Sequence, residues 1–231
     1  MQPESPMMAQ GASSTLALTQ NRVLRNTYML LAVSLVPTIL GAWIGVQTHF
    51  TLFGGHPAIG FVAFLAIAMG FMFGIQATRN SGWGVAVLLG FTFFMGLMLS
   101  GLLAGVLNFT NGFSLIALAF GGTAAIFAAM ATIASTTKRD LSGLSKFLFV
   151  GVIMLLIAGF ANIFLQLPAL MIAFSLVAIA IFSAFMLIDV NRIVTGGETN
   201  YITATLALYL DIYNVFANLL ALLGIFGGSK D

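Results

Sequence analysis

Residues 202–225 read ITATLALYLDIYNVFANLLALLGI, an apolar run in which Asp211 is the one charged side chain. A helix needs about 20 such residues to cross the hydrocarbon core of a bilayer, so this run predicts a membrane span. The whole chain is of the same kind, because 60% of its 231 residues are hydrophobic and only 6% are charged. A soluble domain carries about 25% charged residues. The composition therefore excludes a soluble enzyme and a nucleic-acid-binding protein.

Seven stretches of this kind follow one another along the chain. They cover residues 28–48, 57–77, 83–107, 113–135, 147–166, 170–190 and 202–225. The short segments between them carry glycine, proline, asparagine and charged residues, which is typical of connections. No stretch shows the strand-length alternation of a membrane barrel, and a lipid-embedded chain must otherwise be helical. The sequence therefore predicts an all-α integral membrane protein with seven transmembrane helices.

The lysines and arginines lie on alternate connections of this predicted bundle. Seven of them fall in the N-terminal segment and after helices two, four and six, namely Arg22, Arg25, Arg79, Lys138, Arg139, Lys146 and Arg192. The other connections hold none, and the C-terminus holds Lys230 alone. Because segments rich in Lys and Arg stay in the cytoplasm, we expect a cytoplasmic N-terminus and a C-terminus outside.

The first part of the chain differs from the rest. Residues 1–27 are polar and contain no sustained apolar run. A signal peptide would need an apolar core of about 7–15 residues and a cleavage site of small residues. We therefore expect a mobile cytoplasmic tail over residues 1–27, followed by one membrane domain over residues 28–231.

Small and polar residues share one face of the last predicted helix. Their spacings alternate between three and four, and they are Ala204, Ala207, Asp211, Asn214, Asn218 and Ala221. In a bilayer, small residues let helix backbones approach closely, and polar groups need partners. We therefore expect helix seven to lie centrally and to pack inside the bundle.

Two acidic residues fall inside predicted spans. Asp189 lies in the last turns of helix six, and Asp211 lies about 13 Å along helix seven, counted from Ile202. A carboxylate at such a depth costs several kcal/mol unless it is paired, protonated or hydrated, so both are functional candidates. Helices six and seven are antiparallel neighbours along the chain, which allows the two carboxylates to face each other.

A facing pair would share one proton, because two carboxylates in contact cannot both ionise cheaply. Such a pair would sense cytoplasmic pH. Protonated, it holds helices six and seven together; ionised, it repels and opens a hydrated path that attracts cations. The structural alternative is that asparagine or tyrosine side chains hydrogen-bond Asp211 while Asp189 pairs with Arg192. The residues alone leave both interpretations open.

The patterns of membrane-embedded enzymes do not fit this chain. In intramembrane aspartyl proteases the first aspartate follows tyrosine and the second closes a Gly-x-Gly-Asp, whereas here Ile188 and Leu210 precede the two aspartates. A serine protease needs an intramembrane histidine, but His49 and His56 share an outer connection without a nearby acid or cysteine. A retinal protein needs a lysine in helix seven, and residues 202–225 contain none. We therefore expect no catalytic residue, no metal site and no cofactor.

Several motifs resemble the Bax inhibitor-1 (TMBIM) family. The run GGETNYITATLALYLDIYN over residues 196–214 is similar to its C-terminal signature, and TTKRDLSG over 136–143 is similar to its segment after helix four. The stretches VLRNTY at 23–28 and ANIFLQLPAL at 161–170 are most similar to the bacterial YccA-like branch. The resemblance spans about residues 22 to 228.

The resemblance implies a seven-helix fold in which helix seven is wrapped by the other six. Family members are described as pH-dependent calcium leaks governed by an aspartate pair, a role that would fall here to Asp189 and Asp211, with Ca²⁺ as the transported ion. The bacterial branch is described as binding the membrane protease FtsH and modulating its degradation of membrane proteins. A polar N-terminal tail suits that role, since a processive protease needs an unstructured end to grip.

One feature departs from the leak-type members. Some of these add an intramembrane arginine on helix two, which acts as a latch on the aspartate pair. Helix two here has no charge, so Arg79 or Arg192 would have to act as the latch. Asn214 and Asn218 are the further candidate partners of the pair. Our first hypothesis is a non-enzymatic bacterial inner-membrane protein that modulates FtsH-type proteolysis. The alternative is a pH-gated calcium or cation leak.

Overall fold

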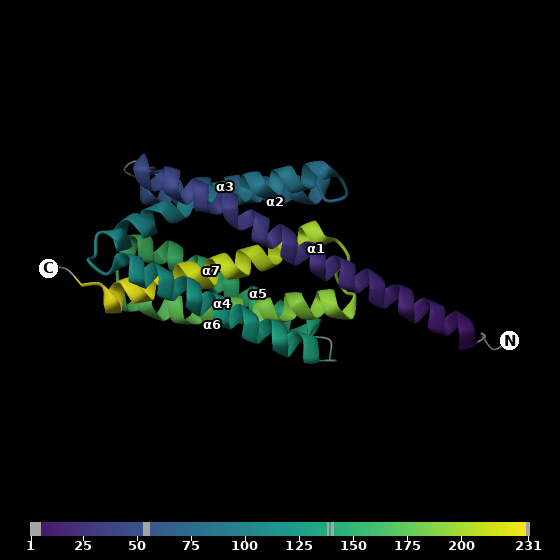
Figure 1. The fold of residues 1–231 in the computed structure, drawn as a ribbon. Coiled ribbons are helices and arrows are strands. Elements are labelled where there is room, and N and C mark those ends of the chain that lie inside the picture. Colours follow the sequence, from purple (N-terminus) through teal and green to yellow (C-terminus); the bar gives the residue numbers. More distant parts are fainter. Residues whose placement is uncertain (1–5, 53–55, 138, 140, 230–231) are drawn as a thin grey trace.

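The computed structural model describes residues 6–52, 56–137, 139 and 141–229, which form seven helices (Figure 1). In chain order these are α1 (Pro6–Gln47), α2 (Pro57–Thr78), α3 (Gly82–Leu107), α4 (Gly112–Thr136), α5 (Ser142–Leu165), α6 (Pro168–Thr195) and α7 (Tyr201–Gly227). Each is long and apolar enough to cross a membrane, and the described residues contain no strand. The prediction of an all-α protein with seven transmembrane helices is confirmed. Lys138 and Lys230, two of the charges counted for orientation, lie outside the described residues.

Apart from the start of α1, the predicted spans and the helices differ most at two ends. α5 begins at Ser142 rather than at residue 147, and α6 runs to Thr195 rather than to residue 190. Hydropathy marks where the chain enters the bilayer, whereas a helix continues beyond that point while its backbone hydrogen bonds are satisfied. α6 ends where Gly196 adopts a left-handed conformation (φ 84°), which costs glycine little.

The N-terminal segment is helical from residue 6 onward, and its mobility and its place in the cytoplasm stay predictions. α1 starts at Pro6 and continues unbroken into its membrane-spanning part, Gln20–Gln47. The segment is rich in alanine, leucine, methionine and glutamine, which favour helix, and it extends an existing helix without a new nucleus. Figure 1 shows this part of α1 projecting beyond the bundle. Residues 1–5 lie outside the described part of the chain.

The helices pack around a crossing of α1 and α3. α7 contacts α1, α2, α3, α4 and α6, while α5 packs against α6 and α2 (Figure 1). Glycines allow α1 and α3 to approach closely: a side chain at Gly96 would meet the backbone oxygen of Thr38, and one at Gly41 would meet that of Phe93. These two long helices of the N-terminal half are thereby held closely against each other.

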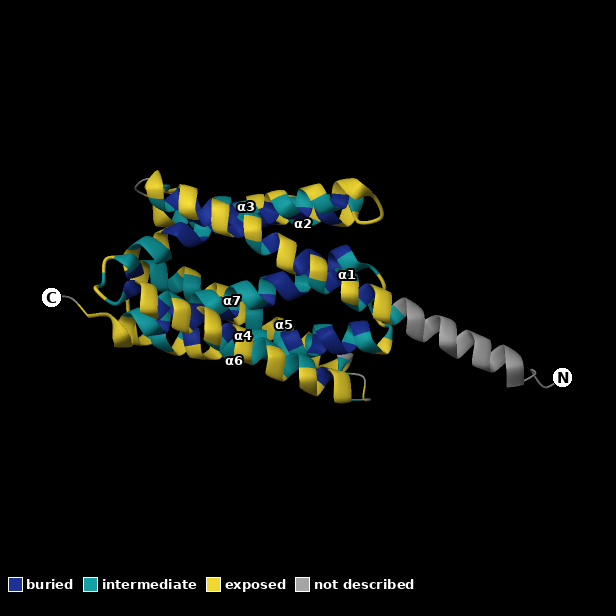
Figure 2. Cartoon of the chain, in the orientation of Figure 1, coloured by how far each residue is buried: buried dark blue, intermediate teal, exposed yellow. Residues whose placement is uncertain are grey.

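α7 is enclosed along most of its length. No residue of α7 before Ile225 is exposed (Figure 2). The predicted small and polar face contains buried residues, with Ala204 2% and Asp211 5% exposed. Burial is not confined to that face, however, because Leu206 and Leu220 are buried as well. Up to Gly224, α7 therefore contributes no exposed residue to the surface of the bundle.

The outer surface of the bundle carries large apolar side chains. Ile39 on α1, Phe73 on α2 and Phe147 on α5 are all more than half exposed, and exposed residues run along the outer helices in Figure 2. Contiguous apolar surface on this scale is not tolerated in water, but lipid chains cover it in a bilayer. The chain is a multi-pass membrane protein.

Candidate functional site

The connection between α6 and α7 holds the two helices that carry the candidate aspartates. The backbone N–H of Glu198 donates to the carbonyl oxygen of Arg192 at 3.1 Å. The carboxylate oxygen Oε1 of Glu198 accepts from the backbone N–H groups of Thr199 and Asn200, at 2.9 and 2.8 Å. The turn is therefore held by its own side chain, which fixes where α6 ends and α7 begins.

Asn200 begins α7 and also ties it to another part of the chain. Its Oδ1 accepts from the N–H groups of Ile202 and Thr203, at 2.9 and 3.2 Å, as an N-cap residue does. Its amide group donates at 3.0 Å to the carbonyl oxygen of Arg79 and to Oδ1 of Asn80. This one side chain links the α6–α7 connection to the α2–α3 connection and so fixes the depth of Asp211.

The structure brings Asp189 and Asp211 together. Their two carboxyl groups lie within hydrogen-bonding reach of each other. Two ionised carboxylates have no hydrogen to share, so a hydrogen bond between them would need one of the groups to hold a proton. Asp211 is buried, and no partner within the described residues satisfies its Oδ2. The pair is thus a candidate site for a shared proton inside the bundle.

Asp189 also contacts the one arginine of α6. Its Oδ1 lies 3.8 Å from Nη1 of Arg192, and the side chains are 14% and 42% exposed, respectively. Asp211, Asp189 and Arg192 therefore form a series that leads from the buried interior to the surface. The two interpretations of the sequence are not exclusive, because Asp189 contacts both the second carboxyl group and the guanidinium group.

The remaining predicted partners make their hydrogen bonds elsewhere. The amides of Asn214 and Asn218 donate to backbone oxygens of their own helix, those of Leu210 and Asn214, both at 2.8 Å. Nη1 of Arg79 donates to Oε1 of Gln76 at 3.2 Å on the exposed surface of α2. Of the four residues considered as latch or pair partners, Arg192 is the one with an ion pair to the aspartates.

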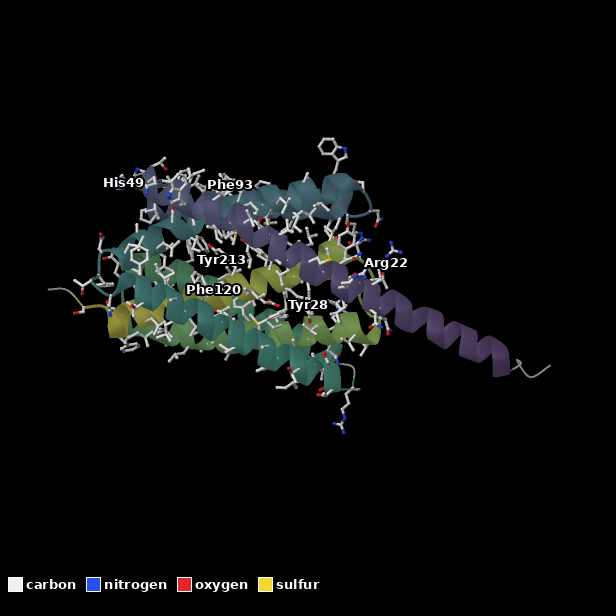
Figure 3. All side chains as sticks on the ribbon, in the orientation of Figure 1. Arg22, Tyr28, His49, Phe93, Phe120 and Tyr213 are labelled. Atoms are coloured by element: carbon white, nitrogen blue, oxygen red, sulfur yellow. The ribbon has the colours of Figure 1, made fainter. Side chains whose placement is uncertain are left out.

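Two tyrosines that the sequence reasoning missed flank Asp211 in α7. The hydroxyl of Tyr209 lies 2.8 Å from Oγ1 of Thr38 in α1, and that of Tyr213 donates to the carbonyl oxygen of Met95 in α3 at 3.2 Å. Figure 3 shows Tyr213 inside the bundle. A buried tyrosine needs a partner for its O–H, so two of them in an apolar span were a signal for interhelical contacts. They hold α7 to α1 and α3 on either side of the aspartate.

Asn191 was also missed, although it lies only two residues beyond Asp189. It is fully buried, and its amide donates to the carbonyl oxygen of Thr137 at 3.0 Å and to that of Ala134 at 3.5 Å. These carbonyls belong to the end of α4, where the helix leaves backbone acceptors without intrahelical donors. The segment of α6 that carries Asp189 is thus tied to the α4–α5 connection.

The described residues offer no ligand set for a metal ion. Within them, no three or more His, Cys, Asp or Glu side chains gather in one place. His49 and His56 both belong to the α1–α2 connection, whose residues 53–55 lie outside the described part.

The comparison with known proteins decides the family. Residues 20–228 match the family described as "Inhibitor of apoptosis-promoting Bax1". The chain belongs to the Bax inhibitor-1 family. The match starts at Gln20, where the membrane-spanning part of α1 begins, and it includes all of the residues that build the aspartate site.

Named and unnamed bacterial relatives cover nearly the whole chain. The "Modulator of FtsH protease YccA" of Escherichia coli K12 is 40% identical over 210 residues, which are 91% of this chain and 93% of that protein. An "Uncharacterized membrane protein" of Vibrio cholerae is 38% identical over 96% of this chain and 97% of its own. An "Uncharacterized protein" of Neisseria meningitidis is 35% identical over 89% and 92%. Within the Bax inhibitor-1 family, the resemblance to the YccA-like branch is confirmed.

Proposed function

We propose that this protein is a non-enzymatic protein of the bacterial inner membrane that modulates an FtsH-type membrane protease. The observation that carries the proposal is the 40% identity to the E. coli modulator of FtsH protease, over nine-tenths of both chains. A second E. coli relative of the same identity is called an inner membrane protein, which supports the location. In this proposal the N-terminus faces the cytoplasm, as the distribution of lysines and arginines indicates.

The N-terminal part of α1 is the part of the chain we propose as the contact with the protease. It projects from the bundle at the end where the arginines gather, and a cytoplasmic protease can reach it without entering the bilayer (Figure 1). Among the residues whose side chains the structure describes, the first that meet the rest of the bundle are Gln20, which a side chain at Gly196 would touch, and Val23, which is buried. The part of α1 before Gln20 projects from the bundle in Figure 1, so we expect its removal to leave the core closed.

A substrate-lifetime experiment tests this proposal. The half-life of a membrane substrate of FtsH is measured in cells that lack their own YccA-type protein and express the full chain or a variant lacking residues 2–15. We expect the full chain to lengthen the half-life and to co-purify with FtsH, and the shortened variant to do neither. A variant with residues 2–15 replaced by a Gly/Ser sequence of equal length is the control for length.

Each arm of that experiment has a contradicting result. If the shortened variant acts like the full chain, residues 2–15 are not the contact. If the full chain neither changes the half-life nor co-purifies with FtsH, the proposed function is wrong altogether.

A second candidate function is a pH-gated leak for Ca²⁺ or other cations. The observation that favours it is the hydrogen-bonded pair of Asp189 and Asp211, which continues to the half-exposed Arg192. Loss of the shared proton would leave two carboxylates in contact, and their repulsion would separate α6 from α7 and admit water and cations. In this role Arg192 restrains Asp189 as the latch.

Calcium flux into proteoliposomes from about pH 6 to pH 8 tests the leak. We expect Asp211→Asn and Asp189→Asn to remove the pH dependence, because neither variant can form a carboxylate pair. Asn218→Ala, which removes another buried polar group of α7, should keep it. A flux with an unaltered pH profile in both aspartate variants would contradict the pair's role, and absence of flux at every pH would exclude the leak.

A further inference from the structure

One exposed stripe runs along α1 and ends in two arginines. The exposed residues recur every three or four positions on one helix face, and they are Arg22, Arg25, Met29, Val33, Val36, Leu40 and Trp43. The rise from Arg25 to Trp43 is about 27 Å, close to the thickness of a bilayer's hydrocarbon core, about 30 Å. The apolar middle of the stripe thus faces lipid chains, and the arginines lie at the level of the headgroups.

The lipid-facing side of α2 also ends in an exposed arginine. Met69 and Phe73 are exposed on α2, and the next turn of that surface carries Gln76, which accepts a hydrogen bond from the exposed Arg79. Trp83 follows in the first turn of α3 and is 74% exposed. Tryptophan side chains favour the membrane interface, because the ring is apolar and its N–H seeks water or headgroup oxygens.

The two stripes end at the same corner of the bundle. The side chain of Gln20 lies beside Gly196, because a Cβ placed there would be 2.8 Å from Nε2 of Gln20. At the other end of the same connection, Asn200 donates to the carbonyl oxygen of Arg79 at 3.0 Å. The α6–α7 connection therefore joins the membrane entry of α1 to the end of α2. Figure 3 shows Arg22 at this end of the bundle.

The arginines at this corner lack carboxylate partners within the described residues. Arg22, Arg25 and Arg79 are exposed and form no ion pair there, since the one ion pair in that part of the chain joins Arg192 to Asp189. The nearby carboxylate of Glu198 accepts from two backbone N–H groups instead. The three guanidinium groups thus keep donors that can bind oxyanions, although Arg79 uses one of its own on Gln76. Their planar donors match phosphate better than an ammonium group does.

We propose that Arg22, Arg25 and Arg79 form a surface that binds the phosphodiester headgroups of anionic phospholipids in the adjoining leaflet. The surface lies where two lipid-facing stripes end and beside an interfacial tryptophan, so the groups that reach it first are headgroups of lipids whose chains already cover α1 and α2. Electrostatic attraction of such clusters to anionic lipid acts within a Debye length of the membrane surface. The proposal is independent of the protease and leak functions.

Trp83 provides the readout, because the chain has only two tryptophans. In a Trp43→Phe background the protein is reconstituted into vesicles of phosphatidylcholine and phosphatidylglycerol, with brominated chains on one lipid class at a time. We expect brominated phosphatidylglycerol to quench Trp83 more strongly than brominated phosphatidylcholine at equal mole fraction. The association constant of phosphatidylglycerol relative to that of phosphatidylcholine should rise by a factor of about five for each arginine that binds a headgroup. The Arg22→Gln/Arg25→Gln/Arg79→Gln variant should bring the constant close to one, and so should high salt.

A matched variant separates a local surface from overall charge. Lys138→Gln/Arg139→Gln/Lys146→Gln removes the same formal charge from the region of the α4–α5 connection, which lies on the other side of the bundle in Figure 1. This variant should keep the preference. Equal quenching by both lipids in the parent protein would overturn the proposal, and so would an equal loss in both triple variants. A preference that survives in the arginine variant would overturn it as well. Unchanged elution and thermal unfolding of the variants establish that each is folded.

Discussion

The two ends of the bundle are built from different chemistry. At the end near the N-terminus lie the aspartate pair, the arginines and the multiple hydrogen bonds of Asn200 and Asn191. At the other end, the described connections contain no Lys, Arg, Asp or Glu. There the amide of Asn111 donates to the carbonyl oxygen of Gly227 at 2.6 Å, and its Oδ1 accepts from the N–H of Ser229 at 3.2 Å. The charged groups thus gather at one end, whereas at the other end hydrogen bonds hold the segment after α7.

An asparagine fastens each end, which allows the two to be compared directly. The side chain of Asn200 makes four hydrogen bonds, two to the start of α7 and two to the α2–α3 connection. The side chain of Asn111 makes two, both to the last residue of α7 and the segment after it. The difference teaches that the end with the charged groups is also fastened by more side-chain hydrogen bonds. In the proposed leak, a proton-dependent repulsion between α6 and α7 would act against this fixed frame.

The largest effect is expected for Asn200→Ala. This change removes the N-cap of α7 and two donors to the neighbouring connection, and we expect it to lower the free energy of unfolding by about 3 kcal/mol. The measurement is unfolding by sodium dodecyl sulfate in mixed micelles. Asn200→Asp keeps the cap acceptor but loses the two donors, so its loss should lie between zero and that of the alanine variant. An alanine loss below that of Asn111→Ala would reverse the comparison of the two ends.

The second effect is a pH dependence confined to the aspartate end. We expect the folded pair to share a proton, whereas aspartates in the unfolded chain release theirs at neutral pH. The folded state therefore binds more protons, and its stability falls as pH rises, by about 1.4 kcal/mol per pH unit while the pair retains its proton. The charged groups that face the pair are Arg192, which is in contact with Asp189, and Glu198 in the connection.

Asp211→Asn should remove this slope. An asparagine amide can still donate to the carboxylate of Asp189, so the contact persists without a titrating proton. Unfolding measured between about pH 6 and pH 8 should then give one stability for the variant and a falling one for the parent. Equal slopes in the two proteins would mean that the pair does not hold a proton in the folded state.

The sequence was sufficient for the helices and for one half of the site. Hydropathy predicted all seven spans, and the depth of Asp189 and Asp211 predicted that they could meet, because antiparallel neighbours joined by a short connection have few other arrangements. Hydropathy does not predict the helical start of α1 at Pro6, because residues 1–27 are polar and contain no sustained apolar run. Helix propensity and continuity with an apolar span decide that segment instead.

The partners across helices could not be predicted from the sequence. Asn200 could be recognised as an N-cap, but nothing local indicates that its amide reaches the carbonyl of Arg79. The contacts of Tyr209 with Thr38 and of Asn191 with the end of α4 depend on which helices are neighbours. That order is set by close packing at glycines such as Gly96, and 25 glycines in the chain do not reveal which of them are the contact points.

The third effect concerns the charge-free end. Asn111→Ala removes two hydrogen bonds to the end of α7 and should lower the free energy of unfolding by about 1 kcal/mol. The loss should be the same at every pH between about 6 and 8, because no titratable group takes part. Hydrogen exchange of the amides after Gly224 should rise in this variant, while exchange near Asp211 stays unchanged. Faster exchange at Asp211 would mean that the two ends are coupled through α7.

The smallest effect is expected for Arg79→Gln. This result would mean that not every polar group at the end with the aspartate pair stabilises the fold. The guanidinium group of Arg79 contacts only the exposed Gln76 among the described residues, and the contact of this residue with Asn200 uses its backbone oxygen, which the substitution keeps. The free energy of unfolding should therefore change by less than about 0.5 kcal/mol in detergent. A larger loss in detergent would place Arg79 in the fastening of the bundle. A change in the free energy of unfolding that arises only when anionic phospholipid is added back would mean that the charge of Arg79 acts at the membrane surface. At this end of the bundle, asparagines would then hold the helices together while arginines bind the membrane.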